Sequence, residues 1–349
     1  MPTYLKHASQ MQRNLEIDTL RGLACIMLVS FHVAGAGQDV GLHLSDTDGL
    51  QRLNLVLSYL RMPLFSFLSG YVYAHRPFQG HTITFIEGKA RRLLLPMLTL
   101  GTIFAVVQSL TLGANSSVNQ WWLLHIIPVG HYWFLEALFI VFLIVMGLEK
   151  IKALSRLLGF SIVWGISVLL HELIVPPPYF ALDGVVYLLP FFLAGLACKR
   201  FELGSDKSRL VATAALIGAA TFLWLLWEPH TSPGQKTLLS GLVAGVSSAF
   251  LLLRSGWRSP WLAYVGSYSF AIYLLHIFFT AGSRITFTQL HVTDIYALLL
   301  LGTTFGIMGP IAAAMLIHRS PRLNRWLLGS SAKMSVSPPP ALHSDAADR

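Results

Sequence analysis

The fold of this chain is decided by its first apolar stretch, which reads Leu20-Arg-Gly-Leu-Ala-Cys-Ile-Met-Leu-Val-Ser-Phe-His-Val-Ala-Gly-Ala-Gly37. The stretch carries a cation, Arg21, at its start and a histidine, His32, eleven positions later. A helix turns by about 100° and rises about 1.5 Å per residue, so both side chains share one face, about 16 Å apart. We therefore predict a transmembrane helix with a fixed charge at one end and a titratable group toward the other.

Apolar runs of similar length recur along the whole chain, which has 349 residues and is 54% apolar and only 12% charged. Soluble domains contain about 25% charged residues, so the composition predicts an all-α fold, a polytopic bundle of membrane helices. The formal net charge of +9 could indicate nucleic acid binding in a soluble protein. Here the basic residues fall in short gaps between apolar runs, so we interpret them as topology determinants and expect no nucleic acid partner.

Hydropathy predicts about ten transmembrane helices, at residues 20–37, 53–73, 93–112, 131–148, 157–174, 179–198, 210–227, 237–253, 260–281 and 295–317. Alternate connections hold every Lys and Arg except Arg52, Arg61, Lys236 and Arg284. The positive-inside rule then places both termini in the cytoplasm. The predicted organisation is a cytosolic segment 1–19, a membrane domain 20–318 and a cytosolic, disordered tail 319–349 rich in Ser, Pro and Ala.

The first segment has an alternative interpretation, because a basic N-terminus and Ala34-Gly35-Ala36 also fit a cleavable secretion signal. The two cysteines, Cys25 and Cys198, lie within apolar segments, and no Cys-x-x-Cys motif is present. We therefore expect neither a disulfide framework nor a metal site.

Four ionisable residues are predicted at similar depth on four helices, near the outer side: His32, Arg61, Glu136 and His276. Polar groups at membrane depth are costly unless they are paired, so each is a candidate functional residue. A carboxylate and an arginine beside two imidazoles could orient a histidine for general base catalysis. The alternative is a hydrogen-bonded network that only holds the bundle together.

A second, basic cluster is predicted at the inner side. It comprises Arg21, Lys89, Arg91, Arg92 and Arg258. Such residues can bind the phosphates of an anionic cytosolic ligand, although each taken alone could be an ordinary topology determinant. The outer connections show no comparable basic cluster, so they give no sign of a second carboxylate on the substrate.

Small residues in the second predicted span, Ser66, Ser69 and Gly70, favour close helix packing. Ser69 is also a candidate substrate contact. His131 lies at a span end, where we expect a solvated histidine of no special role.

Several blocks of the sequence resemble the acyltransferase 3 family of membrane-bound acyltransferases. They are Ile17-Asp-Thr-Leu-Arg-Gly-Leu-Ala24 with His32, Pro63-Leu-Phe-Ser-Phe-Leu-Ser-Gly70, Lys89-Ala-Arg-Arg-Leu-Leu-Leu-Pro96, His131-Tyr-Trp-Phe-Leu-Glu136 and Tyr268-Ser-Phe-Ala-Ile-Tyr-Leu-Leu-His276. The blocks occur in family order between about residues 14 and 318. No single block is decisive, but together they are fairly specific.

The resemblance implies transfer of an acyl group from cytosolic acyl-CoA to a sugar hydroxyl at the outer face of a bacterial inner membrane. It implies a catalytic role for His32, with Arg21 as its partner. The family's basic pair before the third helix is matched by Lys89 and Arg92, with lysine in place of the first arginine. The partners are then acyl-CoA as co-substrate, a saccharide acceptor that can be lipid-linked, and membrane lipids, with no further cofactor.

In the expected mechanism, neutral His32 removes the proton from the sugar hydroxyl, and Glu136 or His276 orients the imidazole. An acyl-histidine intermediate is the open alternative. The acyl group is expected to be acetyl, with succinyl as the other candidate. The acceptor expected from family habit is an exopolysaccharide, a lipopolysaccharide or a lipid-linked precursor.

Two other functions compete with this interpretation. A lipid-linked sugar glycosyltransferase would use acidic residues in the first outer connection, where Asp46 and Asp48 lie. A transporter or flippase for a lipid-linked saccharide would typically show internal repeats with interrupted spans, and none is visible in the sequence.

Overall fold

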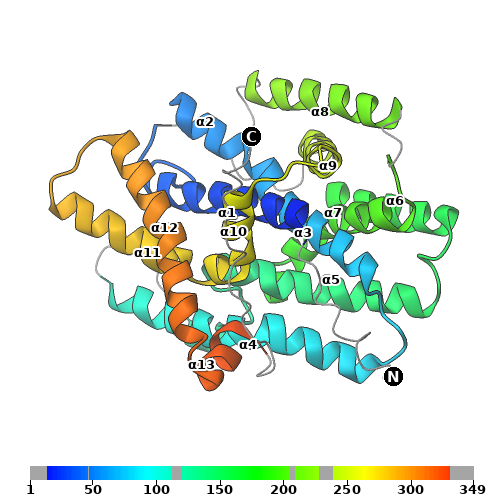
Figure 1. Ribbon diagram of the computed structural model, residues 1–349, viewed down its shortest axis with the longest axis horizontal. Coiled ribbons are helices and arrows are strands. Elements are labelled where there is room, and N and C mark those ends of the chain that lie inside the picture. Colours follow the sequence, from blue (N-terminus) through cyan, green and yellow to red (C-terminus); the bar gives the residue numbers. More distant parts are fainter. Residues whose placement is uncertain (1–13, 46, 112–119, 205–208, 228–238, 331–349) are drawn as a thin grey trace, which may run out of the picture.

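The protein is described by a computed structural model that covers residues 14–45, 47–111, 120–204, 209–227 and 239–330. Within these ranges the chain is almost entirely helical and contains no extended strand, so the predicted all-α fold is confirmed. The main helices, shown in Figure 1, are α1 (Leu15–Ala34), α2 (Gly49–Val56), α3 (Ser58–His75), α4 (Thr82–Leu110), α5 (Trp133–Lys150), α6 (Leu157–Leu173), α7 (Leu182–Arg200), α8 (Arg209–Trp227), α9 (Leu239–Arg254), α10 (Pro260–Ser267), α11 (Ser269–Gln289), α12 (Ile295–Ile317) and α13 (Pro321–Leu328).

Eight helical stretches among the described residues are long and apolar enough to cross a membrane. The shorter apolar helices α6 and α9 lie at the fifth and eighth predicted spans. Each of the ten predicted intervals therefore overlaps an apolar helix. The chain is a multi-pass membrane protein, and the number of crossings and the side of the termini stay predictions.

Helix α1 begins five residues earlier than hydropathy predicts. Asn14 caps it, because its side-chain oxygen accepts hydrogen bonds from the backbone amides of Glu16 (3.0 Å) and Ile17 (3.4 Å). Glu16 and Asp18 lie in the first turn, where negative charge is favourable next to the positive end of the helix dipole. Local capping, rather than hydropathy, therefore determines where this helix starts.

Helix α1 lies near the centre of the molecule and packs against α3, α10, α11 and α12 (Figure 1). At its crossing with α10 a Cβ atom on Gly22 would lie 2.0 Å from the carbonyl oxygen of Leu262. A Cβ atom on Gly266 would lie 1.8 Å from the carbonyl oxygen of Asp18. The two backbones can approach this closely only because both residues are glycine.

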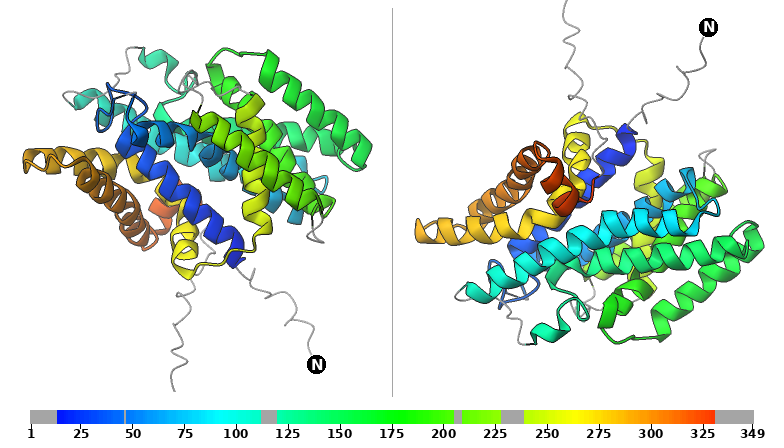
Figure 2. Two further views of the ribbon diagram at one scale, coloured as in Figure 1. Left: turned by 90° about the horizontal axis from the view of Figure 1, so that it is seen from above. Right: turned by 90° about the horizontal axis from the view of Figure 1, so that it is seen from below.

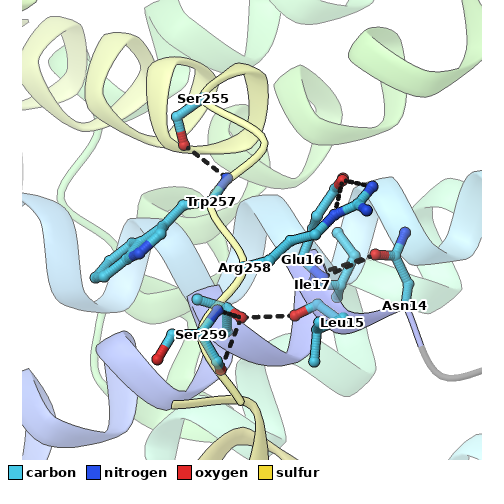
Figure 3. Close-up of polar contacts among 9 residues, drawn as sticks. Asn14, Leu15, Glu16, Ile17, Ser255, Trp257, Arg258 and Ser259 are labelled. Carbon is cyan, nitrogen blue, oxygen red and sulfur yellow. Dashed lines mark hydrogen bonds and ion pairs between the residues drawn. The ribbon is translucent and has the colours of Figure 1, made fainter. Parts of the chain in front are cut away.

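Polar contacts fix the start of α1 to the segment that leads into α10 (Figure 3). The backbone amide of Ser259 donates to the hydroxyl of Thr19 (3.0 Å). The guanidinium of Arg258 donates through Nε (2.8 Å) and Nη2 (2.6 Å) to the carboxylate of Glu16. The rotation of α1 about its axis is therefore set at this end, which also sets the direction in which His32 points at the other end.

Helices α3 and α7 make a second close crossing. A Cβ atom on Gly70 would lie 1.9 Å from the carbonyl oxygen of Phe192, and one on Gly195 would lie 1.9 Å from that of Phe67. The hydroxyl of Ser66 donates to the carbonyl of Leu188 across the same contact (2.9 Å). The predicted packing role of Ser66 and Gly70 is confirmed.

We expect Gly70→Ala to destabilise the protein by about 1–3 kcal/mol, because the added methyl meets backbone atoms that cannot move independently of α7. The matched control is Gly165→Ala on α6, where an added Cβ meets nothing within 4 Å. Alanine should be neutral or slightly stabilising there, since it favours the helix by up to about 1 kcal/mol. Thermal unfolding of both variants in detergent measures the difference, and equal stability would contradict the close crossing.

The segment 319–349 begins with an ordered helix, in contrast to the disordered tail that its composition predicts. Ser320 caps α13 through a hydrogen bond from the amide of Leu323 (3.4 Å), and Gly329 ends the helix with a φ of +61°. The helix packs on α4 (Figure 2). At this contact the hydroxyl of Thr99 donates to the carbonyl of Trp326 (2.8 Å). Capping residues explain this helix, whereas residues 331–349 lie outside the described part of the chain.

Candidate functional site

A cavity of about 430 Å³ opens beside the C-terminal half of α1. Its walls come from α1, α3, α4, α7, α11, the 3-10 turn Gly130–Tyr132 and the first residue of α5, Trp133. The polar and titratable lining residues include His32, Arg61, His131, Tyr187, Tyr273 and Arg284. A volume in this range suits a small molecule or one end of a larger one.

Three histidines from three different elements meet at this cavity. The ring centroids of His32 and His276 are 4.9 Å apart, those of His131 and His276 are 4.9 Å apart, and those of His32 and His131 are 6.2 Å apart. His32 and His131 line the cavity, whereas His276 is fully buried behind them. Among the described residues, no group of three His, Cys, Asp or Glu has the arrangement to hold a metal ion.

The tautomer of His276 follows from its hydrogen bonds. Its Nδ1 atom lies 2.9 Å from the carbonyl oxygens of both Ile272 and Tyr273. Carbonyl oxygens only accept hydrogen bonds, so Nδ1 carries the proton and Nε2 of the neutral ring is an acceptor. That Nε2 atom is buried and has no partner among the described residues. His276 therefore presents an unused proton acceptor at the histidine cluster.

His131 is held in place by two tyrosines that join its turn to α11. The hydroxyl of Tyr273 donates to the carbonyl of His131, and that of Tyr132 donates to the carbonyl of Leu274 (2.8 Å). Both ring nitrogens of His131 are buried without a hydrogen-bond partner among the described residues. The turn is thus fixed by its backbone, and the imidazole is left available to a ligand in the cavity.

The predicted outer cluster is brought together only in part. His32 and Arg61 line the cavity, and the ring of His276 lies behind it, with its centroid 4.9 Å from that of His32. Glu136 is buried on the first turn of α5, but it does not line the cavity, and its Oε2 atom has no partner among the described residues. His131, rather than the predicted carboxylate of Glu136, lies at the cavity beside His32 and His276.

The position of His131 at a span end predicts a solvated histidine, and the structure corrects this, because only 6% of the residue's surface is exposed. The sequence did contain a signal, since His131 opens the block that ends at Glu136. The block is too short to show whether His131 or Glu136 faces the cavity.

The basic residues at the opposite end of α1 lie away from this cavity. Arg21 forms an ion pair with Asp18 on its own helix (3.2 Å). The ammonium of Lys89 lies 3.3 Å from the ring centroid of Phe142, and further aromatic rings lie around it. A cation over an aromatic face is stabilised without an anion, so Lys89 has a structural partner. Arg92, in contrast, is exposed.

Two other predicted residues have local roles in the structure. The hydroxyl of Ser69 donates to the carbonyl of Phe65 on the same helix (2.8 Å), and Ser69 does not line the cavity. Asp48 caps α2 by accepting from the amide of Leu50 (2.7 Å). Asp46, the other acidic residue considered for a glycosyltransferase, lies outside the described residues.

Comparison with known proteins identifies the family. The profile of the acyltransferase 3 family, described as an acyltransferase domain, matches residues 14–319. No match was found among curated proteins or among solved structures. The matched region covers the apolar helices and the histidine cluster, and it amounts to most of the chain. The chain therefore belongs to the acyltransferase 3 family of membrane acyltransferases.

Proposed function

We propose that this protein transfers a short acyl group, acetyl or succinyl, from acyl-CoA to a hydroxyl of a surface saccharide or its lipid-linked precursor. The observation that carries the proposal is the cavity beside His32, lined by two histidines and backed by a third, in a chain of this family. The site would lie in the inner membrane of a bacterium. Membership of the family supports acyl transfer as the reaction. The cavity contains an imidazole, that of His32, which can accept and donate a proton.

In the proposed reaction, the neutral imidazole of His32 takes the proton from the acceptor hydroxyl as its oxygen bonds to the thioester carbonyl carbon. The carbon–sulfur bond then breaks, and the CoA thiolate leaves and takes up the proton from the imidazolium. His32 suits this role because its ring lines the cavity and makes no hydrogen bond to the described residues. An acyl-histidine intermediate is the alternative order of the same bond changes.

The donor phosphates are proposed to bind at the Arg21 end of the bundle. Arg92 is exposed there, and Arg21 is partly exposed beside Asp18. Arginine can hold a phosphate with two parallel hydrogen bonds. Lys89 is the weaker candidate of the family-type basic pair, because its ammonium is occupied by aromatic rings. In this arrangement the pantetheine chain would reach along α1 toward His32.

The proposed function is tested with the purified protein in proteoliposomes, supplied with acetyl-CoA or succinyl-CoA and a saccharide acceptor. The expected result is acceptor-dependent release of CoA thiol together with acylated saccharide, both detected by mass spectrometry. Comparison of surface polysaccharide from cells with and without the protein identifies the natural acyl group and sugar. Sugar transfer that depends on Asp48 and persists without His32 would instead support a glycosyltransferase.

A further inference from the structure

Two arginines face the cavity from different helices. Arg61 comes from α3 and Arg284 from α11, and both line the same cavity as His32 and His131. No aspartate or glutamate occurs among the described residues that line it. The cavity wall therefore carries two fixed positive charges and no compensating negative charge.

Arg61 is the more deeply buried of the two, with only 2% of its surface exposed. Its Nη2 atom donates to the carbonyl of Asn54 (2.9 Å), and its guanidinium stacks over the ring of Phe31, 3.9 Å from the ring centroid. Its buried Nε atom has no partner, and no carboxylate of the described residues pairs with this guanidinium. Burying a charge without a counterion is costly, so an entering anion would be strongly favoured here.

Arg284 is partly buried and is anchored from one side only. Its Nη1 atom donates to the carbonyl of Gly41 in the connection after α1 (2.9 Å). This contact holds the guanidinium at the cavity without neutralising it, and no ion pair joins it to a carboxylate of the described residues. Its remaining N–H groups can serve a ligand, because guanidinium presents five donors in a planar fork that matches a carboxylate.

The outer connections hold no basic cluster, whereas the fold brings two single arginines, from α3 and α11, to one cavity. Arg61 and Arg284 belong to the small group of basic residues that break the positive-inside alternation. They are 223 positions apart, so their presence in one cavity depends on the contact of α1 with both α3 and α11.

We propose that the cavity recognises a carboxylate on one of the two substrates, held by Arg61 and Arg284 while His32 acts on the hydroxyl. This inference rests on the proposed acyl transfer. The carboxylate could belong to a dicarboxylic acyl group or to an acidic sugar of the uronic acid type. In either case the carboxylate lies in the same cavity of about 430 Å³ that His32 and His131 line.

The test measures acyl transfer from each of two matched donors to each of two matched acceptors. Butyryl-CoA and succinyl-CoA have the same carbon count and differ in the terminal carboxylate. A p-nitrophenyl glucoside and the corresponding glucuronide differ in the same way. We expect the wild-type kcat/KM to be at least tenfold higher for the charged member of one pair. Preference among donors identifies the acyl carboxylate, and preference among acceptors identifies the acidic sugar.

Arg61→Gln and Arg284→Gln should each lower that preference about tenfold, because each replacement removes a charge-assisted hydrogen bond to the carboxylate. Arg156→Gln, at an exposed arginine remote from the cavity lining, is the matched control and should keep the preference. If the variant of the buried Arg61 fails to fold, the loss of preference in the variant of the partly buried Arg284 still tests the inference. Equal kcat/KM for charged and neutral probes, or a preference that survives in Arg284→Gln, would overturn the inference.

If the proposed function is wrong, no acyl transfer occurs with any of the four combinations of donor and acceptor. This outcome differs from equal kcat/KM values, which would contradict only the inference. Thermal unfolding then decides the inference by itself, because a ligand that binds the folded state raises its stability. Succinyl-CoA or the glucuronide should raise the unfolding temperature of the wild type more than its neutral counterpart. This difference should disappear in Arg284→Gln. Equal increases in unfolding temperature with the charged and the neutral ligand would contradict the proposal.

Discussion

Replacement of His32 by alanine is expected to lower the rate of acyl transfer at least a hundredfold while the protein still inserts and folds. General base catalysis by a positioned side chain contributes about 10²–10⁴-fold. The His32 ring lines the cavity, whereas His276 is buried behind it and its Nδ1 atom is bound to a backbone carbonyl. The measurement is the initial rate of acceptor-dependent CoA release in proteoliposomes, normalised to the amount of folded protein.

The control for this experiment is His81→Ala, because His81 is an exposed residue at the start of α4 and is absent from the cavity lining. It should retain wild-type activity. Mass spectrometry of the wild type mixed with donor alone distinguishes the two orders of reaction, since only the stepwise route leaves an acyl group on the peptide that contains His32. A His32→Ala variant with undiminished transfer would remove this residue from the chemistry.

The helical architecture could be predicted because membrane helices obey a length rule that hydropathy detects directly. The ends of the helices could not be predicted in the same way. Asn14 starts α1 before the apolar run begins, and Ser320 starts α13 in a segment whose composition suggests disorder. Both starts depend on a single capping residue, whose hydrogen bonds are local and contribute little to a hydropathy average.

The candidate site could be predicted only to the level of depth along each helix. The register of Arg21 and His32 follows from one helix, so their shared face could be inferred. Convergence of His32, His276 and Arg61 also needed the rotation of three helices, which the glycine contact at Gly22 and the polar contacts at Ser259 help to set. Those contacts join residues about 240 positions apart, which a single sequence does not reveal.

The choice between Glu136 and His131 illustrates the same limit. The two residues are five positions apart around the start of α5, at nearly equal predicted depth. Only the docking of their turn on α11, through the hydroxyls of Tyr132 and Tyr273, determines that His131 faces the cavity. In physical terms, the missing information was the rotation of one turn, not its position in the membrane.

Replacement of His276 by phenylalanine is expected to lower kcat about 10- to 100-fold, with little change in the KM for the acyl donor. The ring fills the same space, but the acceptor Nε2 atom beside His32 and His131 is lost. The loss corresponds to about 1.4–2.7 kcal/mol of transition-state stabilisation. Because His276 is buried behind the cavity wall, we assign it a positioning role, in which its Nε2 accepts a hydrogen bond from a neighbouring imidazole as that ring becomes protonated.

His276→Gln provides the conservative comparison, because the amide oxygen of glutamine can reach the position of Nε2 and accept the same hydrogen bond. It should recover part of the lost kcat, whereas phenylalanine should not. A purely structural role predicts the opposite order, since phenylalanine preserves the ring volume and glutamine does not. Thermal unfolding of both variants separates the two effects: if activity follows stability in this pair, the proposed hydrogen bond to the catalytic imidazole is wrong.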